Sequence, residues 1–244
     1  MNKYAKKHTL KIYEVTCFGD LKLLSLFNIL QEVASEHGEI LGLGYNECQK
    51  KEVTWVAASY RVNINRLPKI GEQISIETWI ADLEAVTSQR CYRIKDEQDN
   101  ILLEGITNWA LISKKTLRPV IIAKSLTTNP EQVDGEKLIF SGEKIRLNEP
   151  QRIDSEYHFT SRFDEMDTNF HINNAVYPVW ASESLGQEWL ENKTPKTIQI
   201  NFKNAVKAFE NVSIFTQTEN NESLHKIAVA DQTKAIIKIN WLDK

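Results

Sequence analysis

Cysteine is scarce in this chain, with three residues in 244 at the widely spaced positions Cys17, Cys48 and Cys91. They form no C-x-x-C pair, and their odd number argues against a disulfide framework. We therefore expect free thiols in a reducing compartment, which makes the cytoplasm the expected location.

Long apolar runs and an excess of either charge are also missing. No stretch approaches the roughly 18–20 apolar residues that a membrane-spanning helix needs. The start of the chain, MNKYAKKHTLKIYEV, is basic but lacks the apolar core of a signal peptide. The net charge is −3 and the pI is about 6.0, so we expect no nucleic-acid partner. The sequence shows no G-x-S-x-G, phosphate-binding glycine loop or H-E-x-x-H motif.

What is present is a clear change of hydrophobic period. Apolar residues recur at helical spacing from Leu21 to Leu41, after a fair N-cap at Asp20. Alternating segments predict one strand before this helix and four after it. They are His8 to Val15, Trp55 to Ile64, Ile74 to Trp79, Ser88 to Ile94 and Ile101 to Ile112. The first half therefore predicts an α+β layer, an antiparallel sheet wrapped around one long helix.

The second half repeats the first. Shifted by 138 positions, Asn63 to Thr78 matches Asn201 to Thr216, with Lys69/Lys207 and Glu72/Glu210 among the identities. We interpret the chain as two copies of one strand–helix–four-strand unit. The expected limits are 1–130 for the first unit, 131–152 for a polar, proline-containing linker, and 153–244 for the second unit.

One copy carries a dense polar cluster where the other has an ordinary helix entry. The second copy reads DTNFHINN from Asp167, and the first reads CFGDLKL from Cys17. In an extended backbone Asp167, Asn169, His171 and Asn173 would share one face. A plain loop is the alternative, since Asp and Asn favour turns and N-caps. The enrichment of a single copy favours a functional site.

A helix beginning after this cluster would leave its first N–H groups open to an oxyanion. Asn173 and Asn174 are the expected backbone donors, and Pro178 requires a start no earlier than about Asn174. Asp167 is the expected acid that activates water or attacks directly. Asp164 and Glu165 are more simply a solvated turn or partners of Arg162.

A metal site could be drawn from the polar residues of the second half. Its ligands would be Asp164, Asp167 and His171 with the remote His158. The Asn-rich spacing matches no common ligand pattern, so no metal is expected.

The motif D-x-N-x-H-x-N-N, formed by Asp167 to Asn174, resembles the signature of acyl-acyl-carrier-protein thioesterases of bacteria and plant plastids. Further family-like stretches support this. They are Leu30 to Gly44, Thr54 to Glu72, Thr78-Trp79 and the NWALIS block from Asn108. The resemblance covers nearly the whole chain and implies a tandem, double hotdog fold, in agreement with the repeat.

The resemblance implies hydrolysis of a fatty acyl thioester on acyl carrier protein, with no metal or organic cofactor. Asp167 would be nucleophile or base, Asn169 would orient it or a water, and His171 would polarise the carbonyl or shuttle a proton. The acyl chain would lie in the first unit, with Leu26, Leu30 and Trp55 as candidate lining residues or plain core. Homodimerisation is compatible with this fold.

One departure from the plant members concerns a Glu-Cys pair on the strand after the active helix. Ala205 and Val206 stand at those positions here, which excludes a cysteine nucleophile there. Two other functions stay open at this point. One is hydrolysis of acyl-coenzyme A by the same residues, and the other is a non-catalytic acyl-binding hotdog protein.

Overall fold

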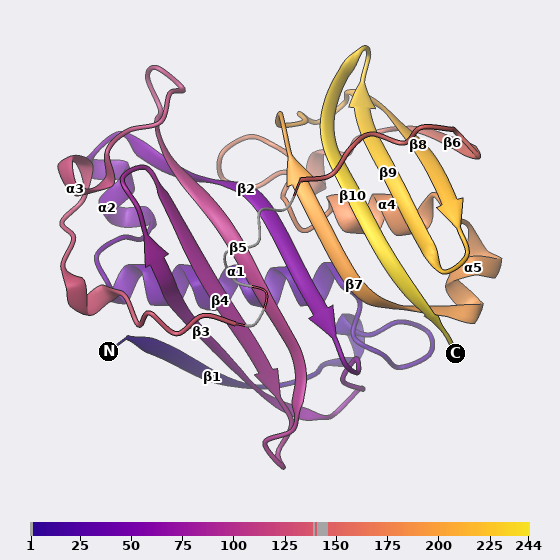
Figure 1. Ribbon diagram of the computed structural model, residues 1–244, viewed down its shortest axis with the longest axis horizontal. Helices are drawn as coiled ribbons and strands as arrows, with labels where there is room; N and C mark the ends of the chain where they lie inside the picture. The colour runs from indigo at the N-terminus through magenta and orange to yellow at the C-terminus, as the bar shows by residue number, and fades with distance from the viewer. Residues whose placement is uncertain (1, 139, 141–145) are drawn as a thin grey trace. The chain divides into compact units, whose positions relative to one another are not determined.

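The computed structural model describes residues 2–138, 140 and 146–244 (Figure 1). The chain divides into two compact units. Unit 1 contains Met1–Ala58 and Asn65–Glu143, and unit 2 contains Ser59–Ile64 and Lys144–Lys244. The predicted limits of 1–130 and 153–244 give no part of the first half to unit 2, whereas the contacts of the folded chain place Ser59–Ile64 there.

Unit 1 is an antiparallel sheet with one long helix on its face (Figure 1). Its strands are β1 (Lys3–Thr9), β2 (Val53–Ile64), β3 (Gln73–Leu83), β4 (Thr87–Lys95) and β5 (Ile101–Ser113), in the order β1-β3-β4-β5-β2. Its helices are η1 (Ile12–Glu14), α1 (Leu23–Ile40), α2 (Tyr45–Lys50), α3 (Ile122–Ser125) and η2 (Pro130–Gln132). The apolar stripe of α1 is buried, with Leu26, Phe27, Leu30 and Val33 each at most 1% exposed.

The predicted long helix and the four strands after it are confirmed, and α1 begins two residues later than Leu21. The predicted first strand over His8 to Val15 is wrong, because the strand ends at Thr9 and a 3₁₀ turn, η1, follows. The Glu14 carboxylate accepts the backbone N–H of Lys11 at 2.7 Å. This bond closes the turn and breaks the alternation.

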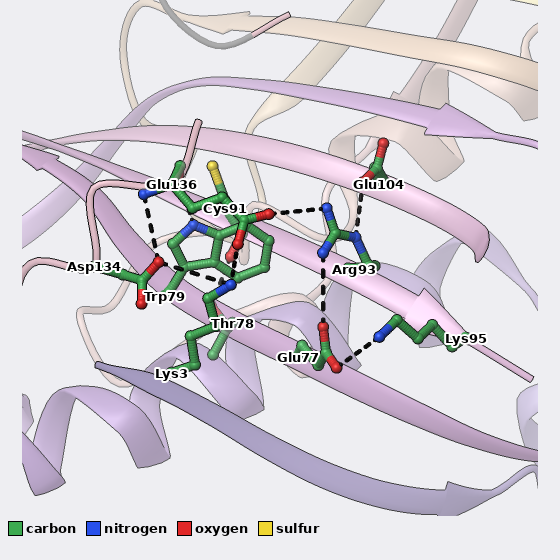
Figure 2. A network of polar contacts seen from close by, with 10 residues as sticks. All are labelled: Lys3, Glu77, Thr78, Trp79, Cys91, Arg93, Lys95, Glu104, Asp134 and Glu136. Carbon is green, nitrogen blue, oxygen red and sulfur yellow. Dashed lines mark hydrogen bonds and ion pairs between the residues drawn. The ribbon is translucent and has the colours of Figure 1, made fainter. Parts of the chain in front are cut away.

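The first part of the predicted linker packs on unit 1. The Trp79 indole N–H donates to the Glu136 carbonyl at 2.8 Å, and the Glu136 carboxylate contacts Arg93 at 3.2 Å. Lys3 pairs with Asp134 and Glu136. Figure 2 shows these residues gathered over one face of β3 and β4. Residues 139 and 141–145 of the predicted linker lie outside the described part of the chain.

Unit 2 repeats the strand order of unit 1. Its strands run β6-β8-β9-β10-β7, with bounds β6 (Ser155–Thr160), β7 (Lys193–Phe202), β8 (Asn211–Glu219), β9 (Glu222–Val229) and β10 (Gln232–Asp243). Ser59–Ile64 of β2 joins this unit because Ser59 to Asn63 pairs antiparallel with Asn201 to Thr197 of β7. The helical segments are η3 (Phe163–Glu165), α4 (Tyr177–Glu183) and α5 (Gln187–Asn192). The predicted internal repeat is thus confirmed, with a shorter main helix in the second copy, where α4 has 7 residues against 18 in α1.

The identical residues of the two copies do the same structural work. Glu72 accepts the backbone N–H of Lys69 at 2.9 Å, and Glu210 accepts that of Lys207 at the same distance. Each bond closes the turn that leads into β3 or β8. The repeat seen in sequence is therefore partly a repeat of turn closures.

The interior of unit 2 holds a buried histidine. His225 on β9 is 0% exposed, and its ring nitrogens lie 2.9 Å from the Thr216 hydroxyl and 2.8 Å from the Ser223 hydroxyl. Burial lowers the pKa of His225 to about 3, so the ring is neutral at ordinary pH. Within the described residues, no helix is both long enough and apolar enough to cross a membrane.

Candidate functional site

The segment from Asp167 to His171 forms a tight turn. The Asp167 N–H donates to the His171 carbonyl at 2.8 Å, and the Phe170 N–H donates to the Asp167 carbonyl at 3.1 Å. Met166 and Ile172 form an antiparallel bridge on either side. The prediction of an extended segment with one polar face is wrong, because Phe170 adopts a left-handed φ of 61° and reverses the chain.

This turn places Asp167 and His171 opposite each other at its base and Asn169 at its tip. Asp167 and His171 are half-buried, and Asn169 is exposed. The Asp167 carboxylate accepts the backbone N–H of Asn169 at 2.8 Å. The backbone bond thus pairs Asp167 with His171 across the turn, which an extended strand would not do.

The residues after the turn lead into α4 through a further turn. Asn173 donates its N–H to the Glu165 carbonyl at 2.8 Å, and its side chain accepts the N–H of Ala175 at 3.0 Å. The helix begins at Tyr177 with Pro178 in its first turn, within the limit that Pro178 set. Of the two expected oxyanion donors, Asn173 already uses its N–H. For Asn174 the described residues supply no hydrogen-bond partner, so its N–H is open.

Glu165 fixes the start of this segment. Its carboxylate accepts the Arg162 backbone N–H at 2.8 Å and the Trp180 indole N–H at 3.1 Å. Asp164 is exposed, and its carboxylate lies 3.6 Å from the Arg162 guanidinium. Both carboxylates therefore contact Arg162, Glu165 through the backbone N–H and Asp164 through the guanidinium. The sequence predicted this simpler role for them.

Tyr177, which the sequence analysis did not single out, and the backbone of Val206, which it considered only for its missing thiol, form hydrogen bonds that hold the turn. The Val206 N–H donates to the Tyr177 hydroxyl at 3.0 Å, and the Val206 carbonyl accepts the N–H of Ile172 at 2.8 Å. Both side chains are buried, at 2% and 0% exposure. The pKa of Tyr177 is raised, first by burial and then by the charges of Glu210 and Asp167.

The candidate acyl-chain residues all lie in unit 1. Leu26 and Leu30 are fully buried on α1. Trp55 is partly buried, donates its indole N–H to the Leu43 carbonyl at 2.9 Å and packs against an apolar cluster. That cluster is formed by Leu43, Cys48, Val53, Ile80, Leu111, Ile122 and Leu126.

The described residues contain no group of three or more His, Cys, Asp or Glu side chains placed to hold a metal ion. His158 lies instead on β6, where its ring contacts Ser213 at 2.9 Å and Glu156 at 3.2 Å. The metal alternative therefore has no geometric support in this part of the chain.

Two family models match the chain. Residues 1–129 match the acyl-ACP thioesterase N-terminal domain, and residues 148–243 match the acyl-ACP thioesterase C-terminal domain. Among curated proteins, a chloroplastic palmitoyl-acyl carrier protein thioesterase of Cuphea hookeriana is 26% identical over 211 residues, which are 82% of this chain and 51% of that protein. An oleoyl-acyl carrier protein thioesterase of Coriandrum sativum is 24% identical over 90% of this chain and 63% of its own length. The chain spans about half the length of the first curated relatives it matches.

Solved structures show the same fold over the whole chain. A putative oleoyl thioesterase of Lactobacillus plantarum superposes with a TM-score of 0.84 at 23% identity, covering 99% of this chain and 96% of its own. A 12:0-ACP thioesterase of Umbellularia californica gives 0.83 at 18% identity, covering 100% and 98%. The double hotdog fold expected from the sequence is thereby confirmed, and with both family models matched, the chain belongs to the acyl-ACP thioesterase family.

Proposed function

We propose that this chain hydrolyses the thioester between a fatty acyl chain and acyl carrier protein and releases a free fatty acid. The observation that carries the proposal is the backbone hydrogen bond that pairs Asp167 with His171 at the base of a turn leading into α4. Family membership and the named activities of the relatives support it. The proposed partner is acyl carrier protein, and the proposed compartment is the cytoplasm, in keeping with three free cysteines.

In this proposal Asp167 either takes a proton from a water molecule whose oxygen attacks the thioester carbonyl, or attacks that carbonyl directly to form an acyl anhydride that water then hydrolyses. The carbonyl oxygen gains negative charge as the new C–O bond forms, and an open backbone N–H stabilises that charge. Asn174 supplies this N–H, because the N–H of Asn173 is engaged with Glu165. Asn169 orients the acid or the water. His171 passes a proton to the departing thiolate as the C–S bond breaks.

The test uses purified protein with acyl-acyl-carrier-proteins of about C8 to C18 and the matching acyl-coenzyme A esters. We expect free acid to form faster from the carrier-protein esters. Asp167→Asn should lower kcat/KM by about 10²- to 10⁴-fold, because an amide can still accept the Asn169 N–H but carries no charge. Asp164→Asn is the matched control, since Asp164 is an exposed carboxylate three residues earlier, and it should keep full activity.

A non-catalytic acyl-binding protein is the second candidate, favoured by Ala205 and Val206 at the Glu-Cys positions of plant members. It predicts tight acyl binding without release of acid. Faster release from coenzyme A would change the substrate and keep the site. Full activity of Asp167→Asn with an intact fold would remove Asp167 from the proposed mechanism.

A further inference from the structure

Tyr177 and Val206 differ from their counterparts in unit 1 in a coordinated way. Ile172 donates its N–H to the Val206 carbonyl at 2.8 Å, and Leu21 donates its N–H to the Pro68 carbonyl at 2.9 Å. Pro68 is therefore the counterpart of Val206. Tyr177 stands 151 residues after Leu26, the same offset that separates Ile172 from Leu21.

Positions 68 and 206 differ in whether the residue there has a backbone N–H that must be satisfied. Pro68 has no N–H, so unit 1 needs no side chain to accept one at this position. Val206 has an N–H, and a buried N–H without an acceptor is costly. In unit 2 the Tyr177 hydroxyl accepts that N–H at 3.0 Å. The result is a hydrogen bond from the first residue of α4 to the β7–β8 connection, which unit 1 does not need.

Val206 also contacts the candidate turn, so the chain of bonds continues. Its carbonyl holds Ile172, the residue directly after His171. The series Tyr177 hydroxyl, Val206 N–H, Val206 carbonyl and Ile172 N–H thus joins the helix start, the β7–β8 connection and the turn that carries Asp167 and His171. We propose that Tyr177 is a positioning residue of the candidate active site, which fixes this turn through the backbone of Val206.

This inference rests on the proposed function for its catalytic part, and the side chain of Tyr177 does not need to touch substrate. The inference also gives Val206 a role through its backbone, at the position where plant members carry a cysteine thiol. The backbone of Val206, held by Tyr177, sets where the acid and the imidazole stand. A small displacement of the acid or the imidazole lowers the reaction rate strongly, because the rate depends steeply on the geometry of the reacting groups.

The experiment compares Tyr177→Phe, the double variant Tyr177→Phe with Val206→Pro, and Tyr157→Phe as control. Tyr157 lies on β6 of the same unit and is 42% exposed, so its variant loses a tyrosine hydroxyl far less buried than that of Tyr177. We expect Tyr177→Phe to lower kcat about 10-fold or more with KM unchanged, and to lower the urea midpoint. The double variant rebuilds the proline solution of unit 1 and should regain the midpoint without regaining kcat.

Recovery of kcat together with the midpoint would overturn the proposal, since Tyr177 would then only satisfy an N–H. Unchanged kcat in Tyr177→Phe would overturn it too. Amide hydrogen exchange gives a readout that does not depend on turnover. Faster exchange of the Ile172 and Asp167 amides in both Tyr177 variants, but not in Tyr157→Phe, supports the positioning role, and unchanged exchange contradicts it. A wild-type protein that hydrolyses no thioester would count against the proposed function alone.

Discussion

The turn from Thr16 to Lys22 and the turn from Asp167 to Asn173 share one backbone and differ in almost every side chain. In unit 1 the N–H of Thr16 donates to the Asp20 carbonyl at 2.8 Å, and the N–H of Gly19 donates to the Thr16 carbonyl at 3.0 Å. Unit 2 makes the same two bonds with Asp167, His171 and Phe170. Both copies therefore build the same scaffold, and only one places an acid and an imidazole on it.

The two turns also share a hydrogen bond from a backbone N–H to the side chain of the first turn residue. The Thr16 hydroxyl accepts the Phe18 N–H at 3.2 Å, where the Asp167 carboxylate accepts the Asn169 N–H. A hydroxyl is thus sufficient to close this turn. The negative charge of Asp167 is more than the fold requires, which is why we assign it to chemistry.

The largest expected effect comes from exchanging the turns. Replacing residues 167–173 by the unit 1 sequence TCFGDLK should leave unit 2 folded, because the backbone bonds are retained. Hydrolysis should fall by at least about 10³-fold, since both the acid and the imidazole are lost. Circular dichroism and the urea midpoint check the fold, and free-acid release checks the activity. An exchanged protein that remains fully active would place the chemistry outside this turn.

A smaller effect concerns stability in acid. It depends on His225, which occupies in unit 2 the position that Tyr92 occupies in unit 1. Thr216 faces His225 across β8 and β9, and Thr78 faces Tyr92 across β3 and β4. The pKa of His225 is about 3 in the folded protein against 6.5 as its ordinary value, so protonation favours the unfolded state between these pH values. The stability contributed is complete above about pH 6.5 and is lost as the pH falls toward 3, amounting to roughly 5 kcal/mol at most.

Replacing His225 by Gln, which does not titrate, should flatten this acid limb. Urea unfolding followed at several pH values from 7 to 4 measures the slope, and the slope of the wild type should exceed that of the variant. A matched substitution of the exposed His158 should leave the slope nearly unchanged. Parallel slopes for wild type and His225→Gln would mean that the buried ring does not control acid unfolding.

The smallest expected effect concerns left-handed positions. Gly71 has a φ of 77°, and its counterpart in unit 2, Phe209, has a φ of 64°. A β-carbon added at Gly71 would meet nothing within 4 Å, so Gly71→Phe tests the backbone conformation without a clash at the β-carbon. We expect a loss of about 1 kcal/mol in the free energy of unfolding. The urea midpoint measures it, and an unchanged midpoint would show that this turn tolerates a side chain freely.

The sequence predicted the repeat, the long helix of unit 1 and the identity of the polar cluster, because periodicity and motif spacing depend on side chains alone. It did not predict the shape of the cluster. Phe170 occupies a left-handed conformation that bulky residues seldom adopt, and alternation of polar residues gave no sign of it. Tyr177 was missed for a similar reason, since its partner is a backbone N–H far along the chain.

The division of β2 has a consequence for any attempt to cut this protein in two. Its first residues, Val53–Ala58, belong to unit 1. Ser59–Ile64 belong to unit 2, where Ser59 to Asn63 pair with β7. A fragment that begins at residue 146 would keep β7 and lose this partner, leaving a row of backbone N–H and C=O groups exposed as a template for aggregation. The gap between the two family models would be a natural place to divide the sequence. A C-terminal fragment cut there would nevertheless lack Ser59–Ile64, which belong to unit 2 although they lie in the first half of the chain.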